Sequence, residues 1–94
     1  MGHHEVRVRT WVKAGEADQR TGLCGWICVE YGALILDGIC LRKTSDGRFV
    51  LSFPARSDRA GRKHSYIRPT DDEARQAIEA EILWQLGERP EFVP

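Results

Sequence analysis

Residues 23–53 read LCGWICVEYGALILDGICLRKTSDGRFVLSF, in which three apolar runs are separated by residues that favour turns. The first run, residues 23–31, is apolar at both alternating sets of positions, and Cys24, Trp26 and Cys28 make up one set. A strand that is apolar on both faces is typical of the centre of a sheet. We therefore expect a central strand that is covered on both sides, followed by a turn at Gly32.

The rest of this stretch predicts two more strands. Residues 33–42 form the second, and the glycine of Asp37-Gly38 inside it indicates a bulge or a turn. Residues 43–47 contain Asp46-Gly47, a pair that favours a hairpin turn with positive φ. Residues 48–53 form the third strand, which Pro54 ends.

Outward from this stretch, the chain adds one strand before it and one helix after it. Residues 5–13 alternate between apolar and polar side chains, which predicts a half-buried strand, and the polar residues 14–22 predict a loop. Residues 55–65 are expected to form a long basic loop, and residues 65–68 could add a short edge strand. An irregular tail is expected over 88–94.

The helix is predicted over residues 70–86. Thr70 and Glu73 have the spacing of a capping box, and the acidic first turn suits the positive end of the helix dipole. Gly87 is expected just beyond the last helical residue. The stripe that should face the sheet recurs at helical spacing and comprises Ala74, Ala77, Ile78, Ile82 and Leu86.

These elements predict one α+β domain over residues 1–94, a small antiparallel β-sheet of four to five strands followed by one C-terminal α-helix. No apolar segment is long enough to span a membrane, and no secretory signal is visible, so we expect a cytoplasmic protein. The three cysteines, Cys24, Cys28 and Cys40, are expected to be reduced and buried. No metal site is expected, because Cys24 and Cys28 lack a second pair of ligands.

Charge is unevenly distributed although the formal net charge is zero. Residues 42–68 carry eight bases and two acids, whereas residues 69–94 carry two bases and seven acids. A basic segment of this kind is typical of a phosphate-binding surface, although solvated loops or pairing with the acidic helix would also explain it. The candidate nucleic-acid-binding residues are Arg42, Lys43, Arg48, Arg56, Arg59, Arg62, Lys63 and Arg68. Tyr66 is the aromatic residue placed to stack on a base.

Catalysis is not expected. His64 lies in the basic segment beside serines that do not form a constellation, and Asp37 is explained by a turn or bulge. No phosphate-binding glycine motif or zinc-protease motif occurs. We expect no cofactor and no small-molecule substrate.

A series of short motifs resembles the SpoVG family (stage V sporulation protein G, also called septation protein) from Gly22 to about Trp84. The matching residues run in the same order as in the family: Asp37-Gly38-Ile39, Asp46-Gly47, Phe49-Val50-Leu51-Ser52-Phe53-Pro54, Ala55-Arg56-Ser57-Asp58-Arg59-Ala60-Gly61 and Ile67-Arg68-Pro69. Where the family has a Lys-Arg pair in the loop, this chain has Arg56-Ser57, and an Arg stands in place of the family's His before the second proline.

The resemblance implies a homodimer of small antiparallel sheets that binds DNA or RNA through the basic loop. It also implies a role as a regulator of gene expression, septation or sporulation. The alternative is a non-catalytic, dimeric protein–protein interaction module whose basic loop meets an acidic partner. The residues alone do not distinguish DNA binding from RNA binding.

Overall fold

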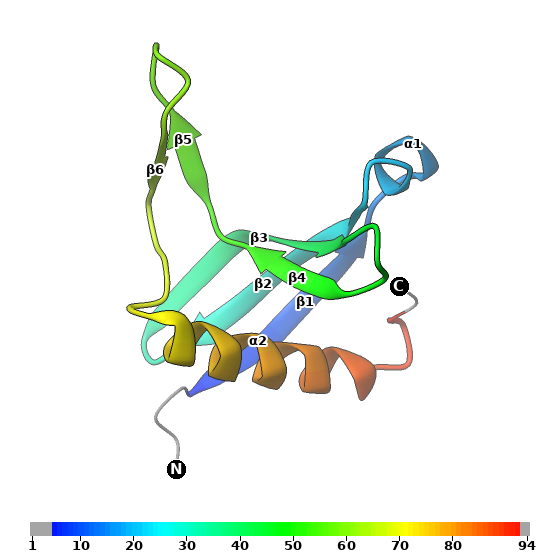
Figure 1. The fold of residues 1–94 in the computed structure, drawn as a ribbon. Coiled ribbons are helices and arrows are strands. Elements are labelled where there is room, and N and C mark those ends of the chain that lie inside the picture. Colours follow the sequence, from blue (N-terminus) through cyan, green and yellow to red (C-terminus); the bar gives the residue numbers. More distant parts are fainter. Residues whose placement is uncertain (1–4, 93–94) are drawn as a thin grey trace.

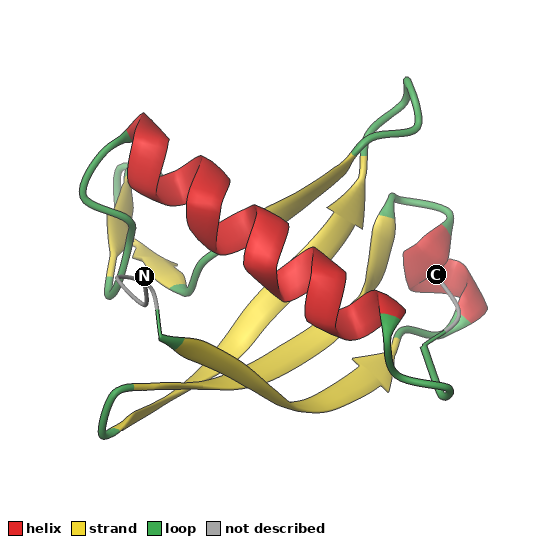
Figure 2. Cartoon of the chain, turned by 90° about the horizontal axis from the view of Figure 1, so that it is seen from below, coloured by secondary structure: helices red, strands yellow, loops and turns green. Residues whose placement is uncertain are grey.

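The computed structural model describes residues 5–92. Its main sheet has four antiparallel strands in the order β1-β2-β3-β4, which are β1 (Val6–Lys13), β2 (Leu23–Tyr31), β3 (Leu34–Lys43) and β4 (Phe49–Ser52). The single long helix, α2 (Asp72–Gly87), lies across one face of this sheet (Figures 1 and 2). The α+β class and the C-terminal helix are therefore confirmed.

The segment predicted as a basic loop is instead a two-stranded hairpin. Its strands are β5 (Ala55–Ser57) and β6 (Lys63–Ser65), and they pair antiparallel as a second sheet. We call residues 55–65 the basic hairpin. It projects from the end of β4 on the side of the main sheet that faces away from α2 (Figure 1). The strand considered for residues 65–68 is thus displaced to Lys63–Ser65.

Three local predictions at element ends are wrong. The loop predicted over 14–22 contains a one-turn helix, α1 (Glu16–Gln19). The N-cap of α2 is Asp71, because its extended backbone lets its carboxylate accept the Ala74 N–H at 2.8 Å, where Thr70 was expected. Gly87, which was expected just beyond the helix, is its last residue, and Glu88 is the C-cap.

The core lies between α2 and one face of the sheet. It is formed by fully buried side chains from both layers, namely Ile27, Val29, Ile39, Leu41 and Leu51 from the sheet and Ile82 and Leu86 from the helix. The opposite face carries the alternate residues of the same strands, and we call it the open face. The prediction that both faces of the central strand are covered is wrong, because one helix supplies only one covering layer; Trp26 on the open face is 36% exposed.

The predicted irregularity at Asp37-Gly38 is confirmed as a shift in the β2–β3 register. Ile27 pairs with Ile39, but Val29 pairs with Leu36, so Asp37 and Gly38 of β3 stand opposite the single residue Cys28 of β2, and β3 has one extra residue. Gly38 adopts φ +80°, a conformation that favours glycine. The shift keeps the apolar residues on both sides of it on the face that α2 covers.

Side chains of α2 also bind both exposed edges of the sheet. At the β1 edge, the Gln85 amide accepts the Val8 N–H at 2.7 Å and donates to the Val6 carbonyl at 2.8 Å. At the β4 edge, Glu79 accepts the Leu51 N–H at 3.1 Å, while Arg75 donates to the Leu51 carbonyl at 2.8 Å. The helix therefore fixes its position on the sheet through backbone groups as well as through the core.

Only one cysteine follows the prediction of burial. Cys24 is buried, and this burial raises the pKa of its thiol, while the charge of Lys43 acts in the opposite direction. Cys28 and Cys40 are partly exposed, because their positions place them on the open face.

Within residues 5–92, no helix has both the length and the apolar composition needed to cross a membrane.

Candidate nucleic-acid interface

Seven of the eight predicted cations lie in two groups, one in the hairpin that follows β4 and one in β3 and the turn that precede it. The basic hairpin, which follows β4, carries Arg56, Arg59, Arg62 and Lys63. The end of β3 and the turn before β4 carry Arg42, Lys43 and Arg48. The eighth, Arg68, lies between β6 and α2. Arg42 and Lys43 pair with Val50 and Phe49 in the first half of β4, so Arg42 lies about 7 Å along the strands from the Cys40–Ser52 pair, at which β4 ends and beyond which the hairpin begins.

One carboxylate organises the turn of the basic hairpin. Asp58 accepts the backbone N–H groups of Ala60 and Arg62, each at 2.9 Å, and the Arg62 guanidinium at 2.9 Å. Its other close partner is the His64 ring nitrogen at 2.8 Å. These hydrogen bonds, led by the one from His64, lower the pKa of Asp58. The hairpin is therefore closed by an ionised Asp58, and Arg62 is partly neutralised by it.

The base of the hairpin meets the open face in a pocket of about 430 Å³, which we call the corner pocket. Cys40 and Ser52 contribute to it from the sheet, and Arg56, Ser57 and Lys63 contribute from the hairpin. Within the part of the chain that the structure describes, its lining contains two cations and no carboxylate. Such a lining suits a phosphate group, which guanidinium and hydroxyl donors can bind together.

In the second group of cations, Arg42, Lys43 and Arg48, two members contact neighbouring residues. Arg48 forms an ion pair with Asp46 at 3.2 Å inside the β3–β4 turn. The Lys43 ammonium lies 5.7 Å from the centre of the Phe49 ring. Arg42 lies on the open face, two residues beyond Cys40 along β3.

Most of the predicted cations form no ion pair with a carboxylate in the described part of the chain. Among residues 5–92, ion pairs within 4.0 Å engage only Arg48 and Arg62 of the eight. Neither partner is one of the acidic residues that begin α2, because those lie on the other side of the sheet from the hairpin (Figure 1). Neutralisation by the helix, which the sequence left open, therefore does not occur between the described residues of one chain.

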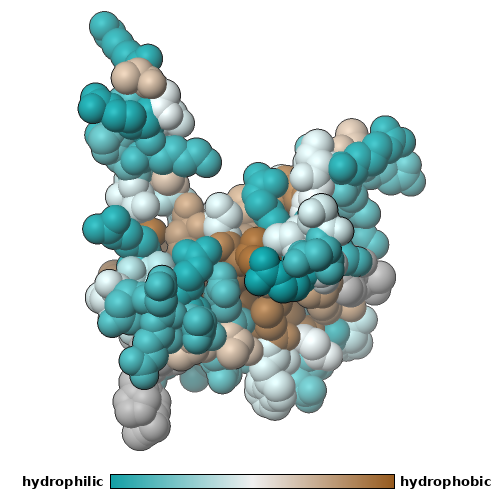
Figure 3. All heavy atoms as spheres, in the orientation of Figure 1, coloured by the Kyte–Doolittle hydropathy of each residue, from teal (hydrophilic) through white to brown (hydrophobic). Residues whose placement is uncertain are grey.

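The molecule is electrically polarised across the sheet. The basic hairpin stands clear of the body as a hydrophilic projection (Figure 3). The seven acids of residues 69–94 lie on α2 and its flanking segments, on the opposite side. A polyanion is consequently attracted to the hairpin side and repelled from the helix side.

Sequence reasoning missed the most prominent aromatic residue of this surface. Trp26 pairs with Cys40, and Cys40 pairs with Ser52, so these three residues form a row across the open face that ends in the corner pocket. The sequence contained the information, because Trp26 belongs to one of the two alternating apolar sets of residues 23–31. That set was interpreted as a buried face. Tyr66 is 66% exposed, but it does not line the corner pocket.

The residues considered for catalysis have structural roles. His64 pairs with Asp58 inside the hairpin, and the Asp37 carboxylate accepts the N–H of Gly38 in the bulge. Within residues 5–92, no three His, Cys, Asp or Glu side chains are arranged to hold a metal ion.

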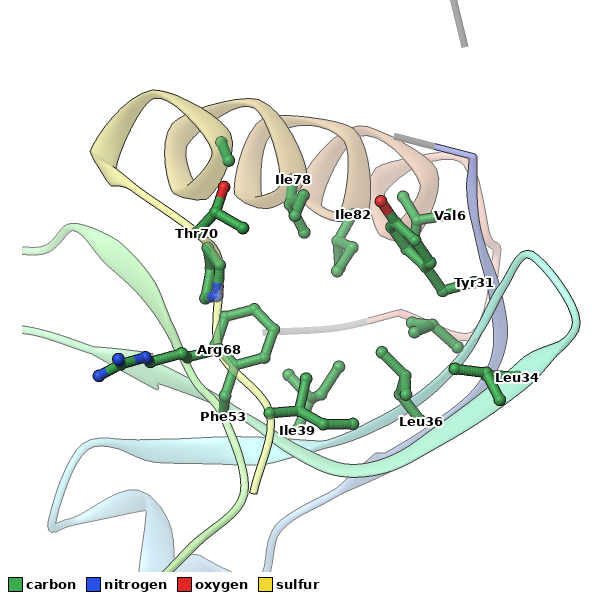
Figure 4. A pocket seen from close by; sticks show the side chains of 14 residues that line it. Val6, Tyr31, Leu34, Leu36, Ile39, Phe53, Arg68, Thr70, Ile78 and Ile82 are labelled. Atoms are coloured by element: carbon green, nitrogen blue, oxygen red, sulfur yellow. The ribbon is translucent and has the colours of Figure 1, made fainter. Parts of the chain in front are cut away.

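A second hollow lies between α2 and the sheet and has an apolar lining (Figure 4). It measures about 310 Å³, and Phe53, Ile78 and Ile82 are among its walls. Arg68 and Thr70 lie at its margin, and the Arg68 guanidinium extends out of the hollow (Figure 4). Arg68 therefore borders this hollow and does not line the corner pocket.

The chain was compared with family models, curated proteins and solved structures, and no match was found in any of the three.

Proposed function

We propose that this protein is a nucleic-acid-binding regulator that holds DNA or RNA through the basic hairpin and the corner pocket. The observation that carries the proposal is the set of unpaired cations on one side of the sheet. Arg56 and Lys63 line the corner pocket, and Arg59 lies at the hairpin turn. Contacts of this type are made to phosphates, so affinity would depend on salt and sequence preference would be weak.

The order of motifs along the chain supports a regulatory role of the SpoVG type, acting on gene expression, septation or sporulation in the cytoplasm. The resemblance includes the strand that ends at Pro54 and the basic segment after it, which together form β4 and the start of the basic hairpin. The role proposed here is binding without catalysis.

The proposal includes a second copy of the chain. Leu34 beside the β2–β3 turn and Ile67 before α2 are both exposed, and they line the same apolar hollow, so they form an exposed apolar patch. A homodimer that buried this patch would leave the basic hairpin of each copy free and would double the cationic surface. Light scattering after size exclusion measures this directly: a mass of two chains is expected, and one chain would contradict it.

The test of nucleic-acid binding is a titration of labelled single-stranded and duplex oligonucleotides at low salt, followed by fluorescence anisotropy. Wild-type protein should bind, and a variant that combines Arg56→Glu, Arg59→Glu and Lys63→Glu should not. Arg48→Glu is the matched control, because this residue lies at the other end of β4 and already pairs with Asp46. Circular dichroism confirms that each variant is folded.

Absence of binding by the wild-type protein would refute the proposal. Equal binding by the triple variant would refute the assignment to the hairpin. If instead an acidic protein partner binds and nucleic acid does not, the alternative of a protein–protein interaction module is correct.

A further inference from the structure

The open face of the sheet has no covering layer in the described part of the chain, yet it carries a tryptophan. Trp26 is flanked on β1 by Val12 and on β3 by Cys40. Val12 is 56% exposed and Trp26 is 36% exposed, so the ring is accessible from the solvent side. A large aromatic ring on an otherwise uncovered sheet indicates a surface that receives a partner.

The partner must match the charge around this ring. The row that begins at Val12 and Trp26 continues through Cys40 to Ser52, and the last two residues line the corner pocket beside Arg56 and Lys63. Successive strands are about 4.8 Å apart, so the Trp26 backbone lies about 10 Å from that of Ser52. The aromatic ring of Trp26 therefore lies near the cations Arg56 and Lys63 of the corner pocket.

A third cation, Arg42, lies on the open face near Trp26. Arg42 is on the same face as Cys40 and pairs in register with Val50 of β4. Glu30, an acid on this face, forms an ion pair with Arg9 at 2.8 Å, so that carboxylate is already neutralised. The surface thus offers one ring on β2 beside two sites for negative charge, Arg42 and the corner pocket, which both lie on the β3–β4 side of the ring.

Single-stranded nucleic acid has the chemistry that fits this arrangement. Its unstacked bases present π-faces to an aromatic side chain, while its backbone supplies a phosphate for every base. The bases of a duplex are stacked inside, so a duplex would contact the hairpin without reaching a ring on the floor of the sheet.

We infer that the open face is a binding platform for single-stranded nucleic acid. On it Trp26 stacks against one base, while Arg56 and Lys63 at the corner pocket and Arg42 farther along β3 neutralise neighbouring phosphates. This inference rests on the proposed function and specifies the form of nucleic acid that is bound.

The test compares Trp26→Ala with Trp84→Ala, a matched control because Trp84 is 63% exposed on α2 and is not part of the open face. The probes are a labelled RNA of about 12 nucleotides, the DNA of the same sequence, and the corresponding duplex, all at one salt concentration. Trp26→Ala should weaken binding of both single strands roughly 5- to 150-fold, and Trp84→Ala should leave it unchanged. The ratio of the affinities for the RNA and for the DNA shows which of the two single-stranded nucleic acids the protein prefers.

A second readout does not depend on a truncated side chain. In a Trp84→Phe background, Trp11 and Trp26 remain as the emitting tryptophans. Emission should be quenched as either single strand is added, and adding Trp26→Phe should abolish this quenching while retaining most of the affinity, because Phe can still stack. Unchanged single-strand affinity in Trp26→Ala, or preference for the duplex without quenching, would overturn the platform while leaving the hairpin function intact. If the wild-type protein binds no nucleic acid, the proposed function itself is refuted.

Discussion

Gln85 provides a sensitive test of how the helix is fixed to the sheet. Its side chain makes two hydrogen bonds to the edge strand β1, one from Val8 N–H and one to the Val6 carbonyl, and a third to Glu81 at 2.7 Å. Gln85→Met keeps the length of the side chain and removes all three bonds. A typical hydrogen bond contributes about 0.5–1.5 kcal/mol net, so loss of the two bonds to β1 should cost about 1–3 kcal/mol.

The assay is urea unfolding followed by circular dichroism, together with hydrogen exchange of the Val8 amide. The midpoint should fall with an unchanged m-value, and the Val8 amide should exchange faster because its acceptor is gone. Gln85→Glu is the informative second variant: it can still accept from Val8 but cannot donate to Val6, and it adds repulsion with Glu81. We expect its loss of stability to be at least as large. If the free energy of unfolding changes by less than about 0.5 kcal/mol in both variants, and the Val8 amide exchanges as slowly as in the wild type, Gln85 does not fix the helix to β1 in this way.

The other predictions concern the core, the sheet and the hairpin. Leu41 is fully buried, so Leu41→Ala should lower the free energy of unfolding by about 2–5 kcal/mol in urea titration. A Cβ on Gly25 would lie 2.4 Å from the Val12 carbonyl oxygen and 2.5 Å from the Trp11 ring, so Gly25→Ala should cost about 1–3 kcal/mol, measurable as a lower Tm; an unchanged Tm would contradict it. Because hydrogen bonds lower the pKa of Asp58 in the folded hairpin, its stabilising effect is present above the unfolded-state pKa and is lost as the pH falls through the folded value. Amide resonances of the hairpin should therefore lose dispersion in acid before those of the main sheet, and in Asp58→Asn this pH dependence should disappear.

Apolar periodicity was sufficient to predict the strands of the main sheet and the helix. The alternation of residues 5–13 and the runs of residues 23–53 correspond to β1 through β4, because burial against α2 requires that pattern. The basic hairpin was missed since its two strands have only three residues each and are exposed, so they contain no apolar signal. The spacing of Asp58 and Gly61 is typical of a turn and could have indicated it.

The candidate site was predicted in composition but not in arrangement. The sequence gives the cations of residues 42–68, whereas their separation into two groups depends on where β4 begins and ends. Trp26 was assigned to a buried face because periodicity reports which residues share a face and does not report how many layers cover the sheet. The pairing of Arg62 with Asp58 likewise follows from the hairpin turn, which was not predicted.

The most direct test of the central claim is the salt dependence of binding to a single-stranded oligonucleotide. The logarithm of the association constant should fall linearly with the logarithm of salt concentration, with a slope of about −0.7 for each phosphate neutralised on a single strand. Replacing Arg56, Arg59 and Lys63 together by Ala should make the slope shallower by about 2. A slope that is the same in the wild type and in this variant would contradict the claim that the basic hairpin contacts phosphates.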